Sequence, residues 1–143
     1  MKIYFAGSIR GGRNDVDNYK KIIEHLKKFG EVLTEHVGDY RLSVKGQYQL
    51  NDDFIRNRDI EWLKQSDVIV AETSNPSLGV GYELASAEKY NIPTIVLHNN
   101  NGKQLSAMIS GTSFFDNIYY YSDIEKAIEY VESEILLYGQ KCN

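Results

Sequence analysis

A single carboxylate among small residues is the strongest chemical signal in this chain. Glu83 lies within Gly79-Val80-Gly81-Tyr82-Glu83-Leu84-Ala85, shortly after an apolar run at residues 67–72. This position predicts that Glu83 stands in the first turns of a helix that follows a buried strand. A carboxylate near a helix N-terminus is stabilised as the anion, and small neighbours leave room for another molecule to approach it. We interpret Glu83 as a nucleophile; the alternative is an ordinary solvent-facing helix residue.

A glycine-rich segment follows the first predicted strand and is typical of a phosphate-binding loop. Its sequence is Gly7-Ser8-Ile9-Arg10-Gly11-Gly12-Arg13. The glycines allow backbone N–H groups to turn inward, Ser8 adds a hydroxyl group, and Arg10 and Arg13 add positive charge. The segment matches neither the dinucleotide-binding fingerprint nor a P-loop. A glycine-rich turn with two solvated arginines is an equal alternative. Together with Glu83, the segment suggests a sugar phosphate as the ligand.

Asp59 is the second candidate acid. It lies on a predicted helix between the apolar residues Ile55 and Trp62. A carboxylate on an apolar stripe is unfavourable unless it is paired or used in chemistry, so we favour a functional role. The alternative is a residue at the edge of the helix that pairs with Arg56 or Arg58.

Tyr4 and His36 are weaker candidates. Tyr4 lies in the first strand, and its pattern alone favours a plain core tyrosine. His36 follows the second strand and is expected at the edge of the site. The histidines are scattered and Cys142 is the sole cysteine, so we expect no metal site and no cofactor.

The elements that must position these residues alternate between strand and helix. We predict strands at residues 3–6, 31–34, 68–72, 94–97 and 118–121, and helices at residues 14–29, 51–65, 79–90 and 123–138. We expect a loop at residues 36–46, a short helical turn at 105–109, and Phe54 on the buried side of the second helix. The alternation predicts one α/β domain over residues 1–143, a doubly wound, flavodoxin/Rossmann-like sheet of about five parallel strands. The site should then lie at the carboxyl ends of the strands.

Composition excludes some partners. The chain has 143 residues and a formal net charge of −4, which disfavours a nucleic-acid polymer as partner. The first residues contain too short an apolar run for a signal peptide, and no run is long enough to span a membrane. We therefore expect a cytoplasmic protein that binds no membrane.

Five stretches, spread over most of the chain, carry a resemblance to a known family. The chain resembles the 2′-deoxynucleoside 5′-phosphate N-hydrolases of the nucleoside 2-deoxyribosyltransferase superfamily. The matching stretches are residues 3–13, 32–36, 59–63, 76–84 and 105–109. The resemblance implies a flavodoxin-like homodimer that cleaves a deoxynucleoside 5′-monophosphate into free base and 2-deoxyribose 5-phosphate.

The resemblance also implies roles for individual residues. Glu83 would form a covalent glycosyl-enzyme, Asp59 would assist at the sugar and in proton transfer, and Tyr4 would position the reacting carboxylate. Ser106 and Met108 would be contributed across the dimer interface, to the phosphate and the base respectively. The full substrate-binding set would comprise Gly7, Ser8, Ile9, Arg10, Gly11, Gly12, Arg13, His36, Ser77, Gly79, Ser106, Ala107 and Met108.

Two alternatives stay open at the level of sequence. A nucleoside 2-deoxyribosyltransferase would share the covalent intermediate but pass the sugar to a second base. Ser106, together with Ser8 and Arg10, favours a phosphorylated substrate and therefore the hydrolase. A nucleotide-binding sensor without catalysis would keep the glycines and need no Glu83.

Overall fold

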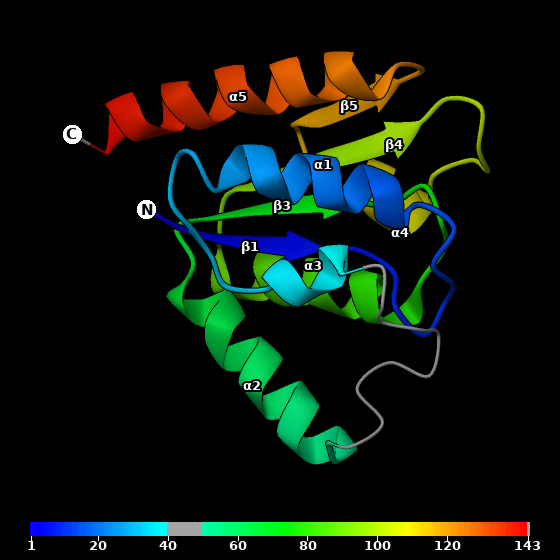
Figure 1. Ribbon diagram of the computed structural model, residues 1–143, viewed down its shortest axis with the longest axis vertical. Coiled ribbons are helices and arrows are strands. Elements are labelled where there is room, and N and C mark those ends of the chain that lie inside the picture. The colour runs from blue at the N-terminus through cyan, green and yellow to red at the C-terminus, as the bar shows by residue number, and fades with distance from the viewer. Residues whose placement is uncertain (40–49, 143) are drawn as a thin grey trace.

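A five-stranded parallel sheet organises the protein. The computed structural model describes residues 1–39 and 50–142 (Figure 1), so residues 40–46 of the predicted loop lie outside the described residues. The strands are β1 (Lys2–Ala6), β2 (Glu31–Val32), β3 (Val68–Glu72), β4 (Thr94–Asn99) and β5 (Ile118–Tyr121). They pair in the order β2-β1-β3-β4-β5, and every pair is parallel. The predicted doubly wound α/β fold is confirmed, and the order is that of flavodoxin-like sheets.

The second strand is shorter than predicted. It ends at Val32, and a 3₁₀ turn, η1 (Glu35–Gly38), begins shortly afterwards. The hydroxyl group of Thr34 accepts a hydrogen bond from the Phe5 backbone N–H at 2.9 Å and donates one to the Phe5 carbonyl at 2.7 Å. This side chain therefore replaces the backbone pairing that a longer strand would have made.

Helices cover both faces of the sheet (Figure 1). One face carries α1 (Val16–Leu26) and α5 (Ile124–Lys141), and the other carries α2 (Asp52–Gln65), α3 (Leu78–Tyr90) and the short α4 (Ala107–Ser110). The prediction that Phe54 lies on the buried side of its helix is wrong. Its side chain is 53% exposed, because Ile60 and Leu63 form the buried side of α2 instead.

The alternation of side chains along β1 decides which residue faces which layer. Ile3 and Phe5 join the core beneath α1 and α5, whereas Tyr4 and Ala6 join the core beneath α2 and α3. Since successive side chains of a strand point to opposite faces, Tyr4 is directed toward the helices that carry the two candidate acids. Among the described helices, none has the length and apolar character that crossing a membrane requires.

Candidate active site

Glu83 projects from the second turn of α3. The helix begins after Ser77, whose hydroxyl group accepts a hydrogen bond from the Val80 backbone N–H at 3.3 Å and so caps the helix. The Tyr4 hydroxyl group donates a hydrogen bond to Oε1 of Glu83 at 2.9 Å. Tyr4 is fully buried, so a side chain of the core holds the candidate nucleophile.

Asp59 lies on α2 and faces the same pocket as Glu83. This pocket, which we call the acid pocket, has a volume of about 670 Å³. A separate, neighbouring pocket has a volume of about 690 Å³. Oδ1 of Asp59 accepts hydrogen bonds from Nε and Nη2 of Arg58, at 3.0 and 2.8 Å. Asp59 is thus paired with Arg58, as one sequence interpretation expected, and it also lines the pocket.

Burial changes the proton affinity of all three groups. Burial raises the pKa of Glu83 to about 8; the charge of Asp59 adds to this rise, and the hydrogen bond from Tyr4 opposes it. Burial also raises the pKa of Asp59, against the stabilising contacts from Arg58. The pKa of Tyr4 rises well above its ordinary value through burial and through the charges of Glu83 and Asp59. The charge of Asp59 thus acts on both Tyr4 and Glu83.

The expectation that the helix N-terminus keeps Glu83 ionised is wrong for this structure. Glu83 lies beyond the first turn of α3, which contains no acidic residue. The effect of the helix dipole falls off within that turn, so the loss of hydration dominates. A carboxyl group with a pKa of about 8 is mostly protonated at pH 7.

The glycine-rich segment forms one wall of the acid pocket, to which Gly7, Ile9, Arg10 and Gly11 contribute. A Cβ atom on Gly11 would meet the Pro76 carbonyl oxygen at 2.9 Å, so glycine is needed for this close approach. Gly12 has φ of +134°, in the region that side chains disfavour.

The segment before α3 holds this loop in place through Asn75. Nδ2 of Asn75 donates hydrogen bonds to Oγ of Ser8 at 3.1 Å and to the Gly11 carbonyl oxygen at 3.3 Å. The backbone N–H of Ser8 donates to the Tyr19 hydroxyl group at 3.1 Å. Ser8 is therefore buried behind the loop, whereas Ser77 and Gly79 line the acid pocket directly.

The two arginines of the segment differ in their surroundings. Arg10 lies at the acid pocket and pairs with Asp52 at 2.8 Å; the side chains are 56% and 81% exposed. Arg13 donates hydrogen bonds to the backbone carbonyls of Ser8, Val37 and Asp39 at 2.7 to 2.9 Å. The guanidinium group of Arg13 thus joins the glycine-rich segment to η1 and is not among the residues that line the pocket.

His36 lies beside α2, with its ring centroid 6.1 Å from that of Trp62. The Arg58 guanidinium group stacks on Trp62, 4.5 Å from the ring centroid. Burial lowers the pKa of His36 to about 4, and the charges of Arg58 and Arg13 lower it further. His36 is therefore neutral at pH 7. It lies near Arg58, the residue that pairs with Asp59, but it does not line the acid pocket.

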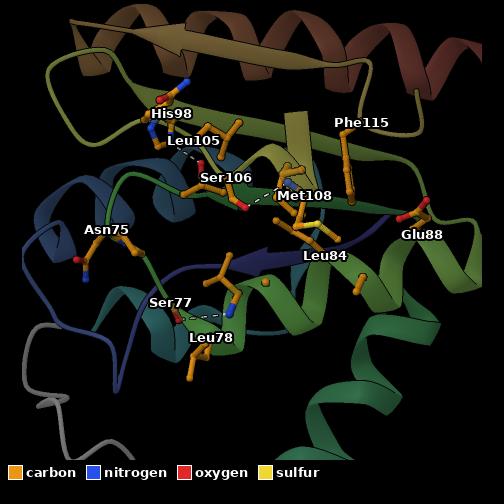
Figure 2. Close-up of a pocket in the computed structure, with 17 residues that line it drawn as sticks. Asn75, Ser77, Leu78, Leu84, Glu88, His98, Leu105, Ser106, Met108 and Phe115 are labelled. Atoms are coloured by element: carbon orange, nitrogen blue, oxygen red, sulfur yellow. Dashed lines mark hydrogen bonds between the residues drawn. The ribbon is translucent and has the colours of Figure 1, made fainter. Parts of the chain in front are cut away.

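The predicted residues near position 106 lie on the other side of α3. Ser106 and Met108 line a second pocket, of about 690 Å³, together with Ser77, Leu84 and His98 (Figure 2). We call it the α3–α4 pocket. Ala107 is exposed at the start of α4. Within one chain, these residues are thus separated from Glu83 by the helix that carries it.

Several contacts of the site were not predicted from sequence. Asn75 and Asp52 carry no motif, although Asn75 stands in a predicted turn where amides often bond the backbone. Glu72, which ends an apolar strand, is completely buried, and its sequence context indicated only a strand residue. Within the described residues, no group of three or more His, Cys, Asp or Glu side chains could hold a metal ion.

Comparison with known proteins gives a consistent result. Residues 3–126 match the family described as nucleoside 2-deoxyribosyltransferase. The 5-hydroxymethyl-dUMP N-hydrolase of Esox lucius is 54% identical over 114 residues, which cover 78% of this chain and 79% of the relative. The protein of the same name from Tetraodon nigroviridis is 46% identical over 135 residues, covering 90% and 95%.

A solved structure shares the fold at low sequence identity. It is the CMP N-glycosidase BcmB of Clostridium botulinum, which aligns with a TM-score of 0.64 over 94% of this chain and 99% of that chain. The two are 17% identical, so this likeness concerns the fold alone.

Proposed function

The chain belongs to the nucleoside 2-deoxyribosyltransferase family, and from this premise we propose that it hydrolyses 2′-deoxynucleoside 5′-monophosphates at the N-glycosidic bond. The products are free base and 2-deoxyribose 5-phosphate. The observation that carries the proposal is the convergence of Glu83 and Asp59 at one pocket beside a glycine-rich loop, with Tyr4 hydrogen-bonded to Glu83 from below. Relatives named for 5-hydroxymethyl-dUMP make that nucleotide the first substrate to test.

In the first step, the ionised form of Glu83 attacks C1′ of the deoxyribose. The bond between C1′ and the base nitrogen breaks, and a C1′–O bond to Glu83 forms. Asp59 donates a proton to the departing base, a role that its raised pKa supports. The Tyr4 hydroxyl group donates to Oε1 of Glu83 and so orients the attacking carboxylate.

In the second step, water replaces the enzyme at C1′. Asp59, now ionised, accepts a proton from that water molecule, and Glu83 leaves as a carboxylate. The route retains the configuration at C1′, as in glycosidases that use two carboxyl groups. A pocket that fits closely around C2′ would reject ribonucleotides, because their extra hydroxyl group would be left without a partner.

The 5′-phosphate group binds between the glycine-rich segment and the start of α3 in this proposal. Ile9 and Arg10 would face it from one side and Ser77 from the other, while Ser8, which is fully buried, would support the loop from behind. Arg10 is available for this role at small cost, since its partner Asp52 is highly exposed. An exposed ion pair contributes only about 0–1 kcal/mol, so a phosphate dianion can displace Asp52.

We further propose that two copies of the chain complete each site. Leu78 and Met108 are 96% and 83% exposed on α3 and α4, and such apolar exposure is typical of an interface. In the dimer, Ser106 of the partner subunit would contact the phosphate group, and Met108 of the partner subunit would border the base. His36 would lie at the opposite edge of the base.

A substrate panel tests the proposed function. The four common deoxynucleoside monophosphates, 5-hydroxymethyl-dUMP, their ribonucleotide counterparts and the matching deoxynucleosides are incubated with the protein, and free base is measured by chromatography. Base should appear only from deoxynucleoside monophosphates, and Glu83→Gln should abolish release while nucleotide binding persists. Equal cleavage of nucleosides would remove the argument for a phosphate site.

The same assay separates the alternatives. Addition of a second free base should yield no new deoxynucleotide, whereas a transferase would form one. A protein that binds the nucleotides but never releases base would be a sensor, and the hydrolase proposal would then be wrong.

A further inference from the structure

A buried acid lies behind the proposed site, on the opposite face of the sheet. Glu72 is the last residue of β3 and is 0% exposed. Val68 and Val70 of the same strand belong to the core beneath α1 and α5, so alternation directs Glu72 to that face, away from Glu83. Burial raises the pKa of Glu72 to about 7, which reflects the cost of placing a carboxyl group there.

The contacts of Glu72 are made by one oxygen atom. Oε1 accepts hydrogen bonds from the backbone N–H of Ser74, at 3.0 Å, and from the Ser74 hydroxyl group. Within residues 1–39 and 50–142, Oε2 of Glu72 has no hydrogen-bond partner, and neither has the hydroxyl group of Tyr121. Both of these hydrogen bonds come from Ser74, in the turn that follows β3, while the Tyr121 hydroxyl group lies near the same carboxyl group. Burial of a carboxyl group is costly, so its two bonds to the turn point to a role there.

Ser74 connects Glu72 to the proposed phosphate-binding elements. Its hydroxyl oxygen accepts a hydrogen bond from the Asn99 backbone N–H at 2.8 Å, which anchors the turn to the end of β4. The next residue, Asn75, binds Ser8 and Gly11 of the glycine-rich segment. Two residues further, Ser77 caps α3, the helix that carries Glu83. A shift of Ser74 would therefore move both walls of the site.

We propose that Glu72 is a positioning residue that fixes Ser74 and, through it, the turn at residues 74–77 in the shape that binds the substrate's phosphate group. The inference rests on the proposed function and adds a residue that touches no substrate. Glu72 acts from the far face of the sheet, and its effect reaches the ligand only through Ser74 and Asn75.

The test compares Glu72→Ala, Glu72→Gln and Ser74→Ala. Glutamine keeps an oxygen acceptor for Ser74 and places an amide donor toward Tyr121, so Glu72→Gln should keep the wild-type KM within about twofold. Glu72→Ala and Ser74→Ala should each raise the KM for the nucleotide by about tenfold, the effect of one lost hydrogen bond of ordinary strength. Inorganic phosphate, used as a competitive inhibitor, should weaken by a similar factor, while kcat changes less.

Two controls separate positioning from general loss of stability. Ile135→Ala removes a buried side chain of α5 from the core beneath α1 and α5, the face of the sheet to which Glu72 points. Ile135 is distant in sequence from the turn at residues 74–77. It should lower the melting temperature and leave the KM within about twofold of wild type. The double variant Glu72→Ala/Ser74→Ala should raise the KM no further than either single variant, because the two residues act as one unit.

The outcomes distinguish this inference from the proposed function. If wild-type protein cleaves nucleotides and both Glu72→Ala and Ser74→Ala keep its KM and its inhibition by phosphate, the inference is overturned and the function stands. If the wild-type protein releases no base, both are overturned. If Glu72→Ala does not fold, Ser74→Ala decides, since Ser74 is only half-buried.

Discussion

Replacement of Glu83 by glutamine should stabilise the protein and abolish base release at the same time. Glu83 has an ordinary pKa of 4.5 and a folded-state pKa of about 8. The unfolded chain therefore releases this proton at a lower pH than the folded protein does. The associated stability is present below pH 4.5 and is lost as the pH rises toward 8. Glutamine cannot ionise and still accepts a hydrogen bond from Tyr4, so the variant avoids this loss.

The size of the effect follows from the displacement of the pKa. At 1.36 kcal/mol per unit, the wild-type protein should lose about 3 kcal/mol relative to Glu83→Gln between pH 5 and pH 8. Urea unfolding measures the difference, at fixed protein concentration and ionic strength. Glu72 lies on the opposite face of the sheet and titrates in both proteins, so its contribution cancels in the comparison.

A control variant on the same helix makes the result specific. Glu88 is an exposed carboxylate of α3 that lines the α3–α4 pocket, and Glu88→Gln should follow the wild-type curve. Asp59→Asn should shrink the loss, because the charge of Asp59 raises the pKa of Glu83. Parallel unfolding curves for wild type and Glu83→Gln from pH 5 to pH 8 would refute the reasoning, since Glu83 would then ionise as freely as in water.

Three further substitutions test single contacts of the site. Tyr4→Phe removes the hydrogen bond that lowers the pKa of Glu83, so the rising limb of the kcat/KM profile against pH should move up by about one unit. Asp52→Asn frees Arg10, and nucleotide KM should fall about two- to fivefold at low salt, with the difference lost in 0.5 M salt (roughly a 4 Å screening length). Gly12→Ala imposes a side chain at φ of +134° and should lower the unfolding free energy by about 1–3 kcal/mol in urea titrations, with a higher KM.

The sequence predicts the strands and loops that position the site well, because the spacing of apolar residues depends directly on which side chains are buried. The sequence pattern located the five strands of the described sheet, although it made the second strand too long, and the rule for parallel sheets placed residues 7–13 and 77–83 at the same edge. Tyr4 was harder to assign, since alternation says only that neighbours face opposite layers. Which layer Tyr4 faces depends on where α2 and α3 pack, and that is a property of the whole fold.

The contacts that determine the ionisation of the site residues could not be predicted from the spacing of residues in the sequence. The ionisation of Glu83 depends on how many protein atoms surround its carboxyl group, and a helix-dipole argument has the wrong sign once burial dominates. The pairing of Arg10 with Asp52 joins residues far apart in sequence with no motif to link them. Glu72 resembles a strand end in sequence, and only its complete burial and its bonds to Ser74 reveal a use.

The raised pKa of Glu83 is compatible with its role as a nucleophile, and magnitudes show why. With a pKa of about 8, about one molecule in ten carries the ionised form at pH 7. Attack from that minority form costs about 1.4 kcal/mol, whereas enzymes lower barriers by about 8–23 kcal/mol. The reaction requires one acid and one carboxylate, and burial raises the pKa of both Glu83 and Asp59. Burial of Glu83 thus has a small effect on the rate of base release and a large effect on the free energy of unfolding. The carboxyl group that attacks C1′ should therefore also limit the stability of the fold at alkaline pH.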